Sequence, residues 1–255
     1  MSEREAPEGM YMYCVIRCER PRQFATLGIG ERGDIVHTMN FEDLAAVVSN
    51  SPVVEYEGRR RNFMAHAAVL EEVMREYAIL PIRFGTVAPS SEAIQKMLKR
   101  RGREFHALLD EMEGCKELGL RAFLYEGAIF QEVVDENPAI RQLRDSLVGV
   151  PPQQSHFDRM KLGEMVQDAM VKKRDADAEA ILARLRPLAH EHKSNPPVTD
   201  RMVLNAAFLV DEKRRPEFDQ TIQQLDQEMG ARLIFKYVDQ VPPYNFVDIV
   251  INWNE

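Results

Sequence analysis

The 255-residue sequence contains little tryptophan and little cysteine, and it has no long apolar run. One tryptophan and three cysteines are present, and a small, odd number of cysteines fits a reducing compartment better than a disulfide-rich secreted protein. No apolar stretch approaches the roughly 20 residues that a membrane span requires. The first ten residues are polar, unlike a secretion signal. We therefore expect a cytoplasmic protein without a membrane partner.

Motifs that indicate catalysis or cofactor binding are also missing. The sequence has no Cys-x-x-Cys or paired-histidine zinc motif, no Walker loop and no nucleophile elbow. Residues 28–33 match G-x-G-x-x-G, but a polar segment precedes them and a predicted strand follows, which favours a loop over a dinucleotide site. Cys14 and Cys18 lie four apart on a predicted strand, as expected for two buried thiols on one face. We expect neither a cofactor nor a metal.

The overall composition is that of a globular protein. Hydrophobic residues make up 45% and charged residues 29% of the chain. The formal net charge of −8 argues against a nucleic-acid partner. Thirteen methionines indicate adaptable packing surfaces, in a core or at an interface.

Hydrophobic periodicity predicts strands and helices interleaved in two sets. Strands are expected at residues 10–18, 34–38, 44–49, 117–124, 202–211 and 232–238, the first of them buried and central. Helices are expected at residues 57–78, 91–112, 137–149, 157–173, 175–189 and 216–229. Residues 20–33 are expected to form a loop or a short helix. The first set fits a ferredoxin-like α+β layer, and the second a smaller sheet with a helical insertion.

We therefore expect an α+β fold with two domains. The first spans residues 1–113. The second spans residues 114–255 and includes the helical insertion, at about 135–190, and an apolar extended tail, at 242–255.

The stretch from His66 to Thr86 begins within a helix and then breaks. One face of that helix is predicted to carry Phe63, Ala67, Leu70, Met74 and Tyr77. Pro81 disfavours helical backbone in the residue before it, so the helix should end near residue 78. Gly85 marks a turn or a close approach of backbone to backbone.

Two polar side chains of this stretch need an interpretation. Arg83 is a permanent cation in an apolar run and would need a carboxylate or carbonyl partner if its neighbours are buried; Glu71 and Glu72 on the preceding helix are the candidates. His66 has no companion motif that would make it a general base, so a structural hydrogen bond to nearby backbone is favoured.

Three blocks of the sequence resemble the gas vesicle protein F/L family. The first has His66, Leu70-Glu71 and then Leu80-Pro81-Ile82-Arg83-Phe84-Gly85-Thr86. The second is Asn205-Ala206-Ala207-Phe208-Leu209-Val210, and the third is Pro242-Pro243-Tyr244-Asn245-Phe246-Val247. A Gly-Pro that many members carry before the third block is replaced here by Asp239-Gln240-Val241.

The resemblance implies two α+β domains, each a modified ferredoxin-like fold, and a non-enzymatic structural or assembly role in gas vesicles. The family-motif residues would then be structural: His66, Leu70, Glu71, Leu80, Pro81, Arg83, Phe84, Gly85 and Thr86. The implied partners are the hydrophobic major shell protein and other gas vesicle accessory proteins, and the implied location is the gas vesicle shell in the cytoplasm.

The apolar tail has two interpretations at this point. It packs back across a sheet, or it presents apolar residues to a partner. The residues that would meet a partner are Pro242, Pro243, Tyr244, Phe246, Val247 and Trp253. A separate hypothesis for the whole chain is a ferredoxin-like enzyme or small-ligand-binding domain, with His66 and Arg83 forming a pocket in which Arg83 clamps a carboxylate or phosphate.

Overall fold

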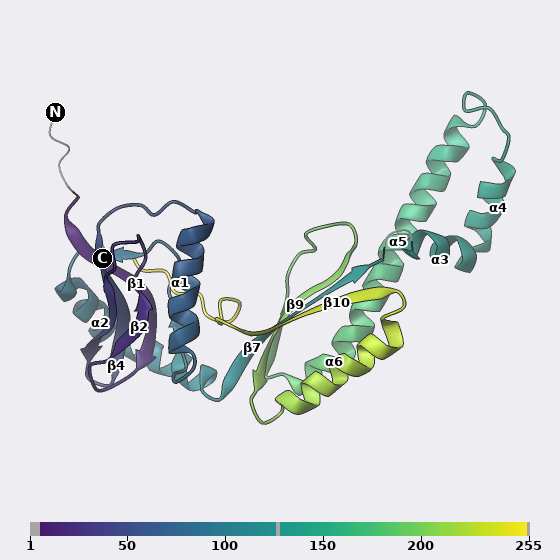
Figure 1. The fold of residues 1–255 in the computed structure, drawn as a ribbon. Coiled ribbons are helices and arrows are strands. Elements are labelled where there is room, and N and C mark those ends of the chain that lie inside the picture. Colours follow the sequence, from purple (N-terminus) through teal and green to yellow (C-terminus); the bar gives the residue numbers. More distant parts are fainter. Residues whose placement is uncertain (1–5, 126–127, 254–255) are drawn as a thin grey trace, which may run out of the picture. The chain divides into compact units, whose positions relative to one another are not determined.

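The computed structural model describes residues 6–125 and 128–253 (Figure 1). The chain divides into two compact units, Met1–Glu117 together with Gln240–Glu255, and Leu118–Asp239. We had expected one boundary, after residue 113, and a tail in the second domain. The structure differs in that residues 240–253 return to the first unit, where the tail buries Pro243, Val247 and Ile249.

The first unit contains a sheet with two helices. Its elements are β1 (Glu8–Arg17), β2 (Gln23–Leu27), β3 (Ile35–Phe41), β4 (Leu44–Pro52), α1 (Arg60–Val73), β5 (Leu80–Pro81), β6 (Val87–Ala88) and α2 (Ser91–Met112). The described strands are ordered β2-β3-β4-β1-β5, and β6 also pairs with β1. Strand β1 pairs antiparallel with its neighbours β4, β5 and β6.

Strand β1 is buried and central, as the sequence predicts. Tyr11 to Ile16 are fully buried. The register of β1 against β4 shifts between Met12 and Cys14, which makes Tyr13 an extra, bulged residue. The bulge reverses the alternation of side chains, so that Tyr11 before it, Tyr13 within it and Cys14 after it all join one apolar cluster. Cys18 joins the same cluster, which confirms that the two thiols share a face.

The two helices of this unit contribute different apolar stripes. Helix α2 matches the predicted bounds and buries six residues, Ile94, Met97, Leu98, Phe105, Leu109 and Met112. Helix α1 buries His66, Val69, Leu70 and Val73. Of the predicted stripe, Leu70 is buried, and Met74 and Tyr77 pack partly buried against the same core. Phe63, expected on the buried face, is 48% exposed. Residues 23–27, expected in a loop or helix, form β2, an edge strand whose mixed polarity hides the strand pattern.

The second unit has a ferredoxin-like order of elements. They are β7 (Cys115–Leu124), α3 (Ala128–Glu136), α4 (Pro138–Ser146), α5 (His156–Leu185), the short helix η1 (Arg186–Leu188), β8 (Glu191–Ser194), β9 (Met202–Asp211), α6 (Arg215–Met229) and β10 (Leu233–Val241). The described strands are ordered β10-β7-β9-β8, the arrangement expected for a β-α-β-β-α-β unit. The predicted α+β class with two antiparallel sheets is thereby confirmed.

The helical insertion is longer and more continuous than predicted. Residues 157–173 and 175–189, expected as two helices, belong largely to the single helix α5. No glycine or proline lies near the expected break, and Lys173 there pairs with Glu132 and Glu136 of α3. Helix α3 was not predicted. Among the described helices, none combines the length and apolar character that crossing a bilayer requires.

Candidate functional site

Two of the three motif blocks meet at the side chain of His66. This residue lies on α1 in the first unit and is 3% exposed. Its Nδ1 atom lies 3.0 Å from the hydroxyl of Tyr11 on β1, and its Nε2 atom lies 2.7 Å from the hydroxyl of Tyr244 in the tail. His66 therefore joins the central strand, a helix and the tail of the same unit through side-chain bonds, whereas the sequence predicted a bond to nearby backbone.

The turn that follows β5 contributes a further bond to this cluster. The N–H of Gly85 donates to the hydroxyl of Tyr11 at 2.9 Å. The turn is closed by Thr86, whose N–H and Oγ1–H both donate to the carbonyl of Arg83, at 3.3 and 2.8 Å. Gly85 has a φ of +85°, a left-handed conformation that favours glycine. The Arg-Phe-Gly-Thr motif is thus the sequence of a tight turn that presents one N–H to Tyr11.

The protonation state of the cluster follows from its burial and its hydrogen bonds. Burial lowers the pKa of His66 to about 4, so the imidazole is neutral at pH 7. A neutral ring donates from one nitrogen and accepts at the other, which suits one tyrosine on each side. A charged ring would donate from both nitrogens, so the Tyr11 oxygen would have to accept from Nδ1 in addition to the N–H of Gly85. Burial also raises the pKa of Tyr11 and Tyr244, whose hydroxyls therefore stay protonated.

Aromatic rings continue from His66 to the surface. The rings of Tyr13 and Phe84 have centroids 5.5 and 5.7 Å from that of His66. Phe63, further along, packs on Phe84 at 4.2 Å between centroids. Phe63 is 48% exposed, and the adjacent Met64 is 59% exposed. The cluster is therefore buried at its polar centre and ends in exposed apolar side chains on α1.

The tail docks on the first unit through buried residues. Pro243 is buried, Val247 is 3% exposed and Ile249 is 2% exposed. The N–H of Val247 donates to the carbonyl of Pro243 at 2.8 Å, which forms a compact turn. Asn245 donates from its backbone N–H and its side chain to the carboxylate of Glu117, at 3.1 and 2.6 Å, and Glu117 is itself 2% exposed.

Packing thus accounts for part of the tail's apolar character, as the first of the two interpretations has it. Val247 and Pro243 face the protein and are not available to a partner in this arrangement. Tyr244 remains 44% exposed, although its hydroxyl lies against His66. Pro242, Phe246 and Trp253 are half-buried.

Arg83 is not buried, contrary to the premise of the sequence interpretation. Its side chain is 63% exposed and pairs with Asp248 of the tail at 3.0 Å. Of the two carboxylates expected to pair with it, Glu71 is exposed, and Glu72 instead accepts from the N–H groups of Ala25 and Thr26, both at 2.8 Å. The prediction of a Glu71 or Glu72 partner was wrong because the turn directs Arg83 to solvent, where the tail supplies the carboxylate.

The remaining motif residues of the first block have plain structural roles. Leu70 and Leu80 are 1% and 0% exposed, and Pro81 is buried opposite Cys14 in the sheet. The middle block, residues 205–210, lies on β9, where Phe208 and Val210 are in the apolar core of the second unit. The structure therefore brings the first and third blocks together and leaves the second in a different core.

The structure gives no support to a shared pocket of His66 and Arg83, since one is buried and the other exposed. Two hollows of the first unit, of about 430 and 410 Å³, are lined mainly by residues of α2 and of 250–253, and neither His66 nor Arg83 lines them. The glycine motif at residues 28–33 forms a loop, as predicted, and this loop connects β3 to the unpredicted strand β2. A Cβ at Gly28 would lie 2.4 Å from the Ser49 hydroxyl, so this glycine serves packing.

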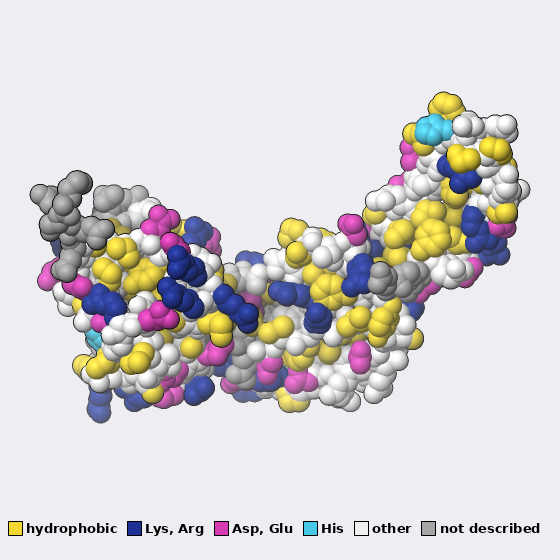
Figure 2. Space-filling view, turned by 45° about the horizontal axis from the view of Figure 1, so that its top comes forward, with side chains coloured by type: hydrophobic (Ala, Val, Ile, Leu, Met, Phe, Trp, Pro, Cys, Tyr) yellow, Lys and Arg dark blue, Asp and Glu magenta, His cyan; other side chains and the backbone are white. Residues whose placement is uncertain are grey.

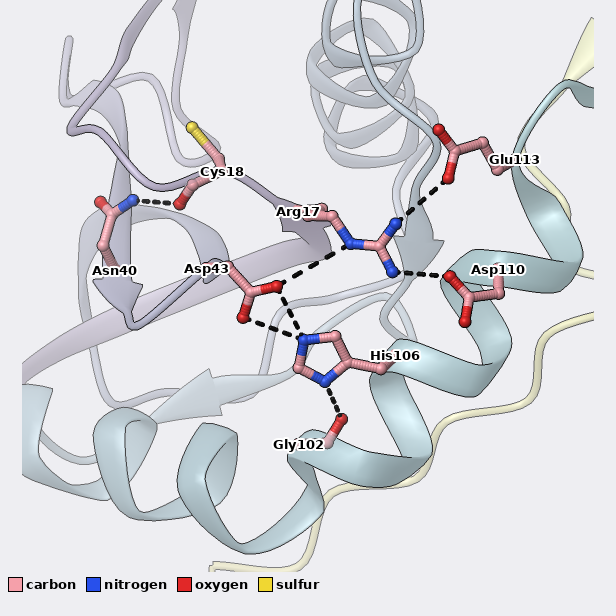
Figure 3. A network of polar contacts seen from close by, with 8 residues as sticks. All are labelled: Arg17, Cys18, Asn40, Asp43, Gly102, His106, Asp110 and Glu113. Atoms are coloured by element: carbon pink, nitrogen blue, oxygen red, sulfur yellow. Dashed lines mark hydrogen bonds and ion pairs between the residues drawn. The ribbon is translucent and has the colours of Figure 1, made fainter.

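A second polar network of the first unit was not predicted. Arg17 at the end of β1 pairs with Asp110 of α2 at 2.7 Å and with Glu113, the residue that follows α2, at 3.1 Å (Figure 3). It also approaches Asp43 at 4.0 Å. The Nε2 atom of His106, on α2, lies 2.9 Å from each carboxylate oxygen of Asp43. The Nδ1 atom of the same ring bonds to the carbonyl of Gly102. These side chains are partly exposed and tie α2 to the sheet.

No local pattern in the sequence could have identified Tyr11, Glu117 or Asp43 as members of these networks. Tyr11 is 55 positions from His66, and Glu117 is 128 positions from Asn245. Among the described residues, no group of three or more His, Cys, Asp or Glu side chains is arranged to hold a metal ion. Both networks bond to groups of the protein from more than one element, which suits them to holding those elements together.

Comparison with known proteins gives relatives of one kind. The chain is 26% identical over 243 residues to gas vesicle protein F of Dolichospermum flosaquae, covering 94% of this chain and 98% of that protein. It is 28% identical to gas vesicle protein F of a Streptomyces species, and the match covers 93% of this chain and 99% of that protein. It is also 26% identical to gas vesicle protein F1 of Halobacterium salinarum, with 96% and 95% covered.

Two solved structures share the fold. The crystal structure of the gas vesicle protein GvpF from Anabaena superposes with a TM-score of 0.85 at 24% identity, covering 96% of this chain and all of that one. GvpF from Microcystis aeruginosa gives a TM-score of 0.75, also at 24% identity, with 94% and 99% covered. Residues 9–248 match the family described as gas vesicle synthesis protein GvpL/GvpF. The chain therefore belongs to the GvpL/GvpF family of gas vesicle proteins.

Proposed function

We propose that this protein is a non-enzymatic structural or assembly protein of gas vesicles that binds the hydrophobic major shell protein. The shell-associated location in the cytoplasm and contacts with other gas vesicle accessory proteins belong to the same proposal. Family membership supports the gas vesicle role. A shell built from a small, very hydrophobic protein needs something to hold its subunits before assembly, because exposed apolar surface aggregates.

The observation that carries the binding proposal is the exposed apolar pair on α1. Phe63 and Met64 are 48% and 59% exposed, and Phe63 is fixed in place by Phe84 of the family motif. Large apolar side chains held rigidly at a surface are typical of contact sites between proteins. The cluster around His66 supports Phe63 through Phe84, and the ring nitrogens of His66 are both bonded to tyrosine hydroxyls.

Co-purification with the major shell protein from gas-vesicle-forming cells tests the proposal. We expect the wild-type chain to retain the shell protein, and the double variant Phe63→Ser/Met64→Ser to lose most of it. Val198→Ser is the matched control, because Val198 is 75% exposed in the second unit and should leave the association unchanged. Normal vesicles after deletion of the gene, together with no association in the pull-down, would contradict the proposal.

A further inference from the structure

The helical insertion of the second unit contains an open apolar groove. Helices α3, α4 and α5 contact one another and enclose a hollow of about 300 Å³. Phe130, Ile140, Leu162 and Val166 line it, and Phe130 is 49% exposed. Figure 2 shows hydrophobic side chains gathered on this part of the molecule, with basic side chains beside them. An apolar surface of this kind on helices commonly receives another protein segment.

A glycine on α5 keeps this groove open. Gly163 lies in the first third of a 30-residue helix, where glycine weakens helix formation relative to alanine. No atom lies within 4 Å of the place where its Cβ would be, so packing within the chain does not require a glycine here. Its backbone lines the groove and is exposed. A bare backbone at this point allows a second backbone to approach closely.

The charged side chains that line the groove are both cationic. They are Arg144 of α4 and Arg159 of α5. Arg159 is held by the hydroxyl of Ser155 and the carbonyl of Val150, at 2.9 and 3.1 Å. Arg144 is paired with its neighbour Asp145. The side chains of Arg144 and Asp145 are 42% and 57% exposed, so Arg144 can turn to an incoming carboxylate. The groove therefore favours an acidic partner over a basic one.

We propose that this groove binds an amphipathic helix of a protein partner. The helix would place an apolar stripe, with residues at i, i+3 or i+4, and i+7, over Leu162 and Val166. Its backbone would pass close to Gly163, and a carboxylate at the edge of its stripe would meet Arg144. The site lies in the second unit, and the inference does not depend on the Phe63 and Met64 surface.

Fluorescence anisotropy with the full chain tests this inference. The probe is a labelled amphipathic peptide with leucines at the stripe positions and glutamates along both edges. A second peptide carries lysines in place of the glutamates. We expect the glutamate peptide to bind the wild type more tightly than the lysine peptide does, and Arg144→Glu to reverse that order.

Filling the groove should abolish the binding. Gly163→Leu places a side chain in the open space of the groove and should weaken binding of the glutamate peptide by at least about tenfold. A titration resolves a difference of this size easily. Leucine favours helix more than glycine, so circular dichroism should show an intact fold. Lys161→Leu is the matched control, because Lys161 is exposed and lies on the other side of α5. It should bind as the wild type does.

Three results would overturn the inference. The wild type would fail to bind the glutamate peptide, or Gly163→Leu would bind it as tightly as the wild type. In the third, sedimentation would show a dimer of the wild type that Gly163→Leu abolishes, which would make the occupant a second copy of this chain. Phe63→Ser/Met64→Ser should bind the peptide normally, so failure of the proposed shell contact and failure of the groove are distinguishable.

Discussion

His66 and Tyr244 are 178 positions apart in the chain, and a hydrogen bond of 2.7 Å joins their side chains. Between these residues the chain leaves the first unit, forms the second, and returns. The bond therefore fastens the returning tail to α1 at a buried point. Because Nε2 of His66 is buried, the bond also satisfies a polar atom that would otherwise lack a partner.

Replacing the tyrosine with phenylalanine should measure what this bond contributes. Tyr244→Phe keeps the ring and leaves a ring nitrogen of His66 without its partner. We expect the free energy of unfolding of the first unit to fall by about 1–3 kcal/mol, the usual result of leaving a buried polar group unsatisfied. Trp253 is the single tryptophan and lies in this unit, so its fluorescence in a urea titration reports the change.

Tyr125→Phe is the matched control for this substitution. Tyr125 belongs to the second unit and is 46% exposed. Removal of an exposed hydroxyl should change stability by less than about 0.5 kcal/mol. An unchanged urea midpoint for Tyr244→Phe would show that the bond between Tyr244 and His66 does not contribute to holding the tail.

The low pKa of His66 predicts how the first unit responds to acid. In the unfolded chain the pKa is the ordinary 6.5, and in the folded protein burial lowers it to about 4. Between these values the unfolded chain binds the proton and the folded one does not, so stability falls as the pH falls from 6.5 toward 4. The full loss is on the order of 3 kcal/mol.

Urea titrations between pH 7 and pH 4 on the wild type and His66→Gln check this expectation. Carboxylates titrate in both proteins, so the informative quantity is the difference between their slopes. The wild type should lose stability more steeply below pH 6.5 than the variant does. Parallel slopes would mean that the folded and unfolded pKa values of His66 are similar.

Local patterns in the sequence were enough to predict most elements of the fold. Helix α2 and strand β9 were predicted with their observed bounds, since a long apolar stripe and an apolar strand both leave strong signals. Strand β2 was missed because an edge strand needs little apolar sequence. Residues 157–173 and 175–189 were predicted as two helices but belong largely to the single helix α5, in which Lys173 bonds to Glu132 and Glu136 of α3.

The His66 cluster could be predicted only in part. The sequence identified His66, Gly85 and Tyr244 as members of unusual blocks, and it favoured a structural role for the histidine. It could not identify Tyr11, which resembles any buried residue of a central strand. Nor could it find Asp248 as the partner of Arg83, because pairs so distant in sequence depend on how the tail returns.

The exposure of Arg83 changes what its removal should do. Removing the cation of a buried ion pair lowers the free energy of unfolding by several kcal/mol. The Arg83 and Asp248 side chains, however, are 63% and 73% exposed. We expect Arg83→Ala to lower the stability of the first unit by less than about 1 kcal/mol. A double-mutant cycle with Asp248→Ala measures the pair directly, and a coupling well above that value would indicate a pair shielded from solvent.

His106 should respond to pH in the opposite sense to His66. Its hydrogen bond to Asp43 raises the pKa of His106 above 6.5, assisted by the Gly102 carbonyl and opposed in part by the nearby Arg17. The stabilisation is complete below pH 6.5 and is lost as the pH rises through the folded pKa. His106→Gln should therefore lower stability at pH 6, by less than about 1 kcal/mol for so exposed a pair, and have less effect at pH 9. Asp43→Asn should remove that difference, and an effect of His106→Gln that is equal at both pH values would show that folding does not raise the pKa of His106.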